Sequence, residues 1–149
     1  MTRRILCVGA LTMDTIFRLE QLPEGAGKFI PIDAVEVAEG MASAQAATIA
    51  RLGGSAALWA SAGDDAIGDR LVQQISGEGV DPSRVRRVPG ARSGFSTIFM
   101  DLSGERMIVP KYDADLMGPA ASAPVAPETT SAPVRSPQMR NCSMAAARN

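Results

Sequence analysis

Apolar residues alternate between short runs and helical faces along the first half of the chain. Residues 5–8 are continuously apolar and end at Gly9, a pattern typical of a buried central strand. Residues 41–52 are mostly good helix formers, and Gly53-Gly54 then supplies a C-terminal stop. Residues 56–60 predict the next buried strand. This order of strand, helix and strand predicts an α/β layer structure.

A second helix and another strand are predicted downstream. Asp65 can cap a helix whose apolar residues fall on one face, namely Ile67, Leu71, Val72 and Ile75. Gly77 and Gly79 end this helix. Residues 85–88 then predict a further strand.

Two segments predict strands at the margin of the fold. Residues 95–102 and 107–109 flank Ser103-Gly104-Glu105-Arg106, which is typical of a hairpin. Residues 29–37 alternate only loosely between apolar and polar, and Pro31 favours an edge or exposed strand there.

Two loops could carry chemistry. Residues 9–14 predict a loop at the carboxyl end of the first strand, where ligands bind in open α/β sheets. Its Asp14 can bind a ligand, cap a turn or lie in solvent. Gly63-Asp64-Asp65 is open to two interpretations, a metal or phosphate loop or a strand–helix connection, and the second is favoured. The chain lacks both the Gly-x-Gly-x-x-Gly fingerprint and a Walker loop, which argues against dinucleotide binding and a P-loop.

Composition narrows the possible functions. The chain has 149 residues, but aromatics make up only 4% of it and alanine supplies much of the apolar fraction, so a thin core is expected. The net charge of −1 gives no overall field that would attract nucleic acid or acidic lipid. Histidine is absent, which removes the commonest general base and the commonest zinc ligand.

Cysteine usage and the absence of long apolar runs favour a cytoplasmic protein without a membrane partner. Cys7 is predicted to be a buried thiol and Cys142 to lie in a mobile tail, so no disulfide between them is expected. No apolar run suits a signal peptide or a membrane helix. Four arginines lie close together in the sequence, namely Arg84, Arg86, Arg87 and Arg92. Because no aromatic residues lie between them, this cluster is predicted to be a solvated rim and not a nucleic-acid surface.

A change of composition divides the chain into residues 1–116, predicted to fold, and residues 117–149. From Gly118 onward there is no Leu, Ile, Phe, Trp or Tyr, so this Ala-, Pro- and Ser-rich tail is expected to be disordered. We hypothesise a shifted or truncated reading frame. The downstream nucleotide sequence tests this, because the hypothesis fails if no strand–helix pattern appears in the other frames.

Four short patterns together resemble one known family. They are Gly9 with Asp14 after the first strand, Gly40 before a helix that ends in Ala50-Arg51-Leu52-Gly53, Gly63-Asp64-Asp65 before Gly68-Asp69, and Asp101 with Gly104-Glu105-Arg106 in the hairpin. In this order they are similar to the N-terminal portion of the ribokinase-like sugar kinases, also called the PfkB carbohydrate kinase family. The resemblance covers residues 4–116.

This resemblance implies a fold and an activity. The fold is a three-layer α/β/α, Rossmann-like, doubly wound sheet with a small β lid, and its C-terminal half would be missing from this chain. Residues 28–39 and 93–109 would supply lid strands. The implied activity is transfer of the γ-phosphate of ATP to a sugar hydroxyl, with ATP and Mg²⁺ as cofactors, and the lid implies a possible homodimer.

The resemblance also implies a sugar-binding site. Asp14 would accept hydrogen bonds from sugar hydroxyls. Gly40 and the backbone at Met41 would let the sugar lie close to the start of the following helix. Met41 stands where the family usually has a second glycine, and Ala44 stands where it usually has an asparagine that binds the sugar.

The catalytic and nucleotide-binding residues of this family lie in its C-terminal half, in a pattern that resembles Gly-Ala-Gly-Asp. No Gly-x-Gly-Asp occurs in this sequence. We therefore expect a sugar-side fragment with little or no activity. The alternatives are a non-catalytic module that dimerises through its lid or binds sugar, and a decayed product that folds poorly.

Overall fold

The computed structural model describes residues 4–117 of the chain. The predicted disordered tail lies outside the described residues from Gly118 onward, and so does Cys142. Within the described part, Cys7 is buried and is a free thiol, and burial raises the pKa of this thiol.

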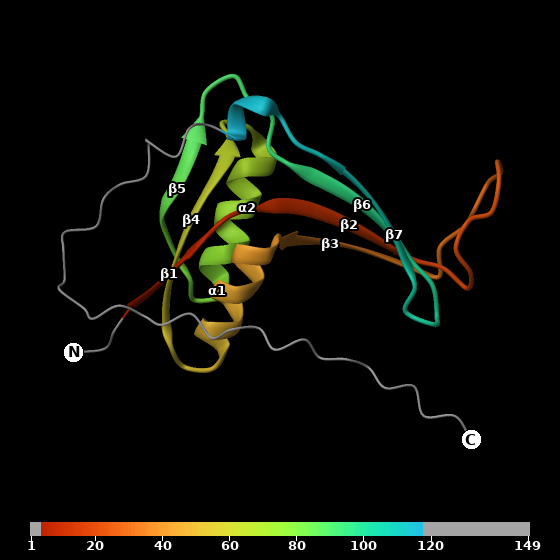
Figure 1. Cartoon of the computed structure of the whole chain (residues 1–149), viewed down its shortest axis with the longest axis horizontal. Helices are drawn as coiled ribbons and strands as arrows, with labels where there is room; N and C mark the ends of the chain where they lie inside the picture. Colours follow the sequence, from red (N-terminus) through yellow and green to blue (C-terminus); the bar gives the residue numbers. More distant parts are fainter. Residues whose placement is uncertain (1–3, 118–149) are drawn as a thin grey trace, which may run out of the picture. The chain divides into compact units, whose positions relative to one another are not determined.

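The described strands form two sheets (Figure 1). The first is a parallel sheet with the strand order β1-β4-β5, made of β1 (Arg4–Val8), β4 (Ser55–Gly63) and β5 (Asp81–Val88). The second has the order β3-β2-β6-β7, made of β2 (Thr12–Arg18), β3 (Asp33–Glu39), β6 (Phe95–Met100) and β7 (Arg106–Lys111). Figure 1 shows the second sheet extending away from the helices, as expected of a lid.

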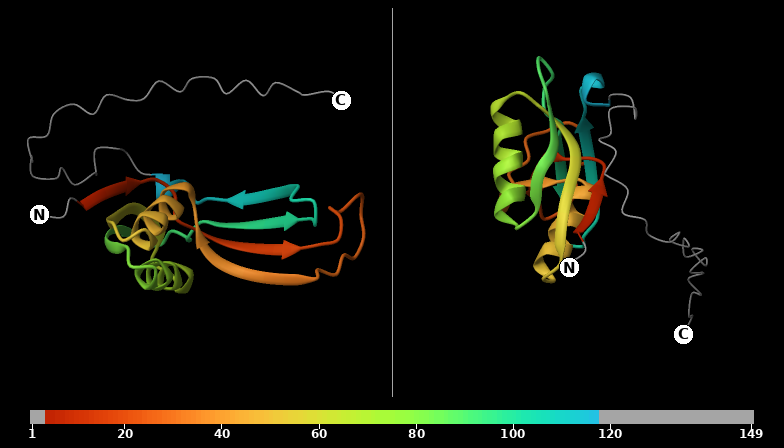
Figure 2. Two further views of the ribbon diagram at one scale, coloured as in Figure 1. Left: turned by 90° about the horizontal axis from the view of Figure 1, so that it is seen from below. Right: turned by 90° about the vertical axis from the view of Figure 1, so that its left-hand side faces the viewer.

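Two helices cover one face of the parallel sheet (Figure 2). They are α1 (Met41–Arg51) and α2 (Ala66–Gly77). α2 connects β4 directly to β5, and α1 lies in the longer connection from β1 to β4, after β2 and β3. Right-handed crossovers that proceed in one direction place both helices on the same face. A short 3-10 helix, η1 (Ala114–Met117), follows β7. The described residues therefore supply the sheet, one helical layer and the lid of the expected architecture.

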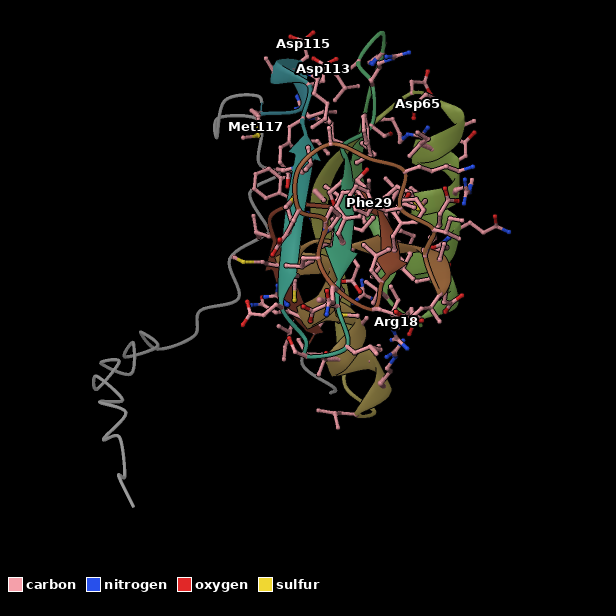
Figure 3. The ribbon with its side chains drawn as sticks, turned by 90° about the vertical axis from the view of Figure 1, so that its right-hand side faces the viewer. Arg18, Phe29, Asp65, Asp113, Asp115 and Met117 are labelled. Atoms are coloured by element: carbon pink, nitrogen blue, oxygen red, sulfur yellow. The ribbon has the colours of Figure 1, made fainter. Side chains whose placement is uncertain are left out.

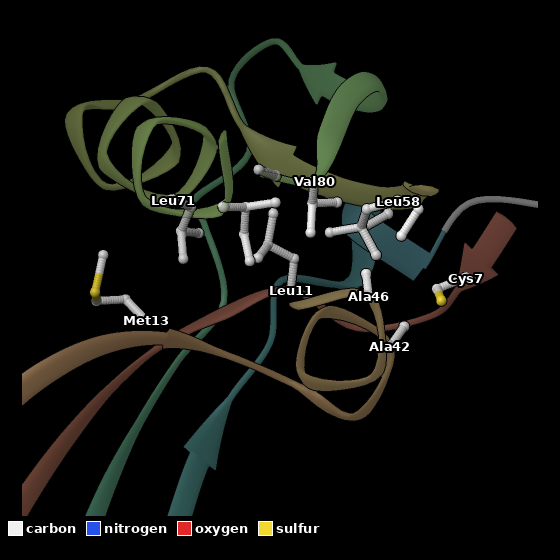
Figure 4. Packing of buried hydrophobic residues seen from close by; sticks show 12 residues of the cluster. Cys7, Leu11, Met13, Ala42, Ala46, Leu58, Leu71 and Val80 are labelled. Atoms are coloured by element: carbon white, nitrogen blue, oxygen red, sulfur yellow. The ribbon is translucent and has the colours of Figure 1, made fainter. Parts of the chain in front are cut away.

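The core lies between these helices and alternate residues of β4 (Figure 4). Leu58 of β4 and Leu71 of α2 are fully buried. Ala42 and Ala46 of α1 contact the same cluster. Because alanine side chains are small, the backbone of α1 can approach the sheet closely. The predicted helix over 41–52 is therefore confirmed, and it ends at Arg51.

The apolar run of residues 5–8 predicted a buried central strand. Among the described residues, however, this strand is not central. β1 pairs with β4 alone and lies at the edge of its sheet. Ile5 is 50% exposed and Val8 is 55% exposed, and only Cys7 in this strand is buried. An apolar run indicates that a strand can be buried on both faces, but it does not predict which elements cover those faces.

Strand boundaries differ from the predictions in two further places. The predicted loop over 9–14 is shorter, because β2 already begins at Thr12 and contains Asp14. The strand predicted over 85–88 begins earlier, at Asp81. It includes Pro82, which β5 tolerates because it lies at the edge of the sheet.

The predictions for the lid agree with the structure. The strand predicted over 29–37 is an edge strand, as expected, but it begins later, at Asp33, and runs to Glu39. β6 and β7 form an antiparallel hairpin in which Met100 pairs with Arg106. Sequence analysis had assigned β3, β6 and β7 to the lid, and the structure adds β2 to them.

Candidate functional site

The residues around Asp14 lie where β2 meets the end of β3. The two strands are antiparallel, with Thr12 opposite Glu39 and Asp14 opposite Val37. Residues directly opposite each other share a face of the sheet, so Thr12, Asp14 and Glu39 lie on one face. The Thr12 hydroxyl donates a hydrogen bond of 2.9 Å to Asp14 Oδ1. No other hydrogen bond reaches the Asp14 carboxylate from the described residues, which leaves Oδ2 available.

Gly40 joins β3 to α1 and passes close to the backbone of Ala10. Its φ of 117° favours glycine. A Cβ at this position would lie 2.4 Å from the Ala10 carbonyl oxygen. Glycine is therefore required here by the fold itself, because it lets the start of α1 approach the loop between β1 and β2. The Ser43 hydroxyl donates a 2.9 Å hydrogen bond to the Gly40 carbonyl.

The start of α1 has no side-chain cap. No side-chain hydrogen bond caps the helix at Gly40, and its first turn contains no acidic residue. The first N–H groups of a helix have no partner within the helix. Met41 lies at this end and is 82% exposed.

Ala44 lies on the next turn of α1 and lines a groove of about 560 Å³ between α1 and α2. Glu39, Thr48 and Gln74 also line it. At one side of the groove Arg51 forms a 2.6 Å ion pair with Glu78. A methyl group at position 44 neither donates nor accepts a hydrogen bond, so the polar groups of this groove come from its other residues.

Glu39 both lines this groove and lies on the same face of the sheet as Asp14. Burial raises the pKa of the Glu39 carboxyl above its usual value, the Asp14 carboxylate raises it further, and Arg51 opposes the shift. The two carboxyls are thus electrostatically coupled at the end of the β2–β3 ladder. A pair of carboxylates can accept hydrogen bonds from the hydroxyl groups of a polyol.

The structure places Asp14 near the end of the β2–β3 ladder, just before Gly40 and Met41, whereas Ala44 lies one turn further along α1 and lines the groove between α1 and α2. Asp14 pairs with Val37, three residues before Gly40, and Met41 and Ala44 follow in α1. The roles of these residues in sugar binding stay predictions. Sequence analysis missed Thr12 and Glu39. Recognition of β2 as a strand would have found Thr12, because residues two apart share a face.

The loop at residues 63–65 is a strand–helix connection, as favoured from the sequence. Asp65 caps α2 and accepts a 2.8 Å hydrogen bond from Gly68 N (Figure 3). It also accepts bonds from Ser93 N at 2.9 Å and from Ser93 Oγ at 2.6 Å. Burial alone would raise the pKa of Asp65, but these hydrogen bonds and the charge of Arg87 outweigh it and lower the pKa.

The prediction of a solvated arginine rim is wrong for two of the four arginines. Arg87 donates to the Gly63 carbonyl at 2.9 Å and to Asp69 at 2.8 Å, so it holds the loop before α2. Arg86 donates to Ser61 Oγ at 3.1 Å and to the Leu116 carbonyl at 3.2 Å. Both guanidinium groups thus form hydrogen bonds with other residues of the chain.

Residues 4–117 show no metal cluster and no membrane-spanning helix. No group of three or more His, Cys, Asp or Glu side chains in this range is placed to hold a metal ion. No helix in the same range is long and apolar enough to cross a membrane.

Comparisons with known proteins agree on one family. The model of one protein family, described as "pfkB family carbohydrate kinase", matches residues 2–119. The chain is similar to the solved structure of a putative ribokinase from Agrobacterium tumefaciens, with 46% identity and a TM-score of 0.75, over 78% of this chain and 38% of that chain. It is similar to ribokinase from Giardia lamblia at 25% identity and a TM-score of 0.66, over 74% of this chain and 34% of that one.

A third solved structure, Arabidopsis thaliana ribokinase complexed with ribose and ATP, shares the fold. It is 24% identical, with a TM-score of 0.61, over 74% of this chain and 36% of that chain. Across these three structures, this chain therefore spans between 34% and 38% of the length of the proteins it matches.

Gly40→Ala tests whether the start of α1 depends on the close approach to Ala10. We expect it to lower the free energy of unfolding by about 3 kcal/mol or more, because the new Cβ collides with a carbonyl oxygen at an unfavourable φ. Urea denaturation measures this. Gly77→Ala is the matched control, since a Cβ there meets nothing within 4 Å and should change stability by about 1 kcal/mol or less. Equal stability of the two variants would contradict the argument.

Proposed function

The chain belongs to the pfkB family of carbohydrate kinases, and we propose that it carries the sugar-binding part of an enzyme that phosphorylates a sugar hydroxyl with ATP. One observation carries the proposal. Asp14, with a free carboxylate oxygen, lies on the strand that pairs with β3 just before Gly40 and the uncapped start of α1. The Arabidopsis ribokinase was solved with ribose and ATP, which supports a sugar as the ligand class.

The proposed roles follow from the chemistry of each residue. An ionised carboxylate only accepts hydrogen bonds, so Asp14 would bind two sugar hydroxyls, or one hydroxyl beside Thr12. Gly40 has no side chain, and the sugar would reach the backbone at Met41 there. Ala44 would lie beside the sugar and contribute only apolar contact. Glu39 lies on the same face as Asp14 and, when ionised, would accept a hydrogen bond from a sugar hydroxyl.

ATP and Mg²⁺ are implied by the family, but the described residues do not fit them. No three acidic, His or Cys side chains are placed together in the described range, and no Gly-x-Gly-Asp occurs in the 149 residues. We infer that this chain by itself is a sugar-side fragment with little or no phosphoryl transfer.

Asp14→Asn tests the sugar-binding role. We expect the 149-residue chain to bind one or more members of a panel of neutral pentoses and hexoses, and the variant to bind about tenfold more weakly or worse, because an amide replaces a charged acceptor. Titration calorimetry measures the affinities. Glu105→Gln, at an exposed residue of the β6–β7 turn, is the charge-matched control and should bind like the wild type. Equal affinities for all three proteins would refute the role of Asp14.

An ATP-coupled assay with the same panel tests the activity of the chain alone. We expect a rate equal to that of the blank without protein, since positioning and charge stabilisation at the γ-phosphate supply nearly all of this catalysis. Rapid, sugar-dependent ADP release would contradict the inference of an inactive fragment and would leave the family assignment unchanged.

The alternative is a non-catalytic module that dimerises through its lid or binds sugar. The exposed edge of the second sheet favours it. Every residue of β7 is exposed, and Ile108 is 47% and Val109 55% exposed. An edge strand presents unpaired N–H and C=O groups to another chain.

Light scattering after size exclusion tests this alternative. If the lid mediates association, the wild-type chain runs as a dimer, and Ile108→Lys converts it to a monomer by placing a charge on the edge. Lys111→Ala, at the end of the same strand, is the control and should not dissociate it. A wild-type chain that stays monomeric across a concentration series would exclude lid-mediated dimerisation.

A further inference from the structure

The side chain of Ser96 on β6 is buried and has no hydrogen-bond partner. Ser96 is 4% exposed. Its Oγ is the one buried side-chain oxygen or nitrogen of residues 4–117 that lacks a partner. Buried hydroxyls are nearly always hydrogen-bonded, and each exception needs an explanation.

A second buried serine shows the usual arrangement three residues earlier. Ser93 is 2% exposed. Its Oγ accepts a 3.0 Å hydrogen bond from Gly63 N and donates a 2.6 Å bond to Asp65. Ser93 therefore has a structural role that its contacts explain. Ser96 has no such contact, although it lies on the neighbouring part of the same segment.

The strand register places Ser96 beside Asp14. β2 and β6 are parallel, and Asp14 pairs with Ser96. Paired residues of neighbouring strands share a face, and the strands lie about 4.8 Å apart. Thr12 occupies only one oxygen of the Asp14 carboxylate. The face thus presents a carboxylate with a free oxygen next to a hydroxyl with no partner. The Ser96 hydroxyl can change direction by rotation about one torsion, without movement of the backbone.

An aromatic ring lies beside Gly94, two residues before Ser96 in the chain. A Cβ on Gly94 would lie 3.1 Å from Thr12 Cγ2 and 3.2 Å from Tyr112 Cδ1. The absence of a side chain at Gly94 therefore makes room for the Tyr112 ring, which is part of a residue 43% exposed. Ligand sites typically combine apolar and aromatic walls with a few polar groups that fix orientation.

We infer that Ser96 is a specificity-determining residue of the sugar site, whose hydroxyl pairs with a sugar hydroxyl next to one that Asp14 binds. This inference rests on the proposed function and extends it to a residue on another strand. A ligand with neighbouring hydroxyls satisfies the Ser96 oxygen and the free Asp14 oxygen together. A sugar that lacks the hydroxyl facing Ser96 leaves this oxygen unpaired, and sites of this kind reject such analogues.

Ser96→Ala tests the inference in the 149-residue chain, by titration calorimetry with the monosaccharide that binds best and with its monodeoxy analogues. We expect the variant to bind the parent sugar about three- to tenfold more weakly. We also expect the wild type, but not the variant, to discriminate against one particular monodeoxy analogue. The variant should unfold at the same or a higher temperature, because no protein hydrogen bond is lost.

Ser93→Ala is the matched control, another buried serine changed to alanine. It should lower the unfolding temperature, because it removes two hydrogen bonds, and it should leave the sugar affinity of the folded protein unchanged. Unchanged affinity in Ser96→Ala, alongside weakened binding in Asp14→Asn, overturns the inference and leaves the proposed function standing. Tighter binding by Ser96→Ala also overturns it. A wild-type chain that binds no monosaccharide overturns the proposed function and this inference together.

Discussion

The approach of Gly40 to the carbonyl of Ala10 is the contact on which the geometry of the site depends. It fixes the start of α1 against the loop that joins β1 to β2. Because β3 runs directly into Gly40, the same contact also sets where the β2–β3 ladder ends. Asp14, Glu39 and the first turn of α1 thereby come together. A side chain at position 40 would separate the lid from the helical layer at the point where the proposed sugar site lies.

Local signals predicted the elements that local chemistry determines. Asp65 caps α2 as its position before an apolar helical face suggested, and α1 ends at Arg51, before the predicted glycine stop. Non-local facts were not predictable in this way. The exposure of β1 depends on which strands lie beside it, and the role of Arg87 depends on a loop that precedes it by more than twenty residues. No local pattern encodes either.

The residues of the candidate site likewise divide into those that the sequence could predict and those that it could not. Asp14 and Gly40 could be found because a family resemblance named them, and their neighbourhood follows from the register of β2 and β3. Ser96 had no signal in the sequence, since it is one serine in a strand-forming segment. Only the comparison with Ser93 distinguishes it, because both are buried and only one has partners. Burial and hydrogen bonding must be known together before such a residue can be identified.

The charges on this face also limit the ligand. Burial raises the pKa of the Glu39 carboxyl, and the neighbouring Asp14 carboxylate raises it further. An anionic ligand such as a sugar phosphate would add a third negative charge to a partly buried pair. A neutral polyol has the opposite effect, because its hydroxyl groups donate to the carboxylates and stabilise their ionised forms. These two carboxyls thus favour an uncharged sugar over an anionic one as the ligand of the proposed site.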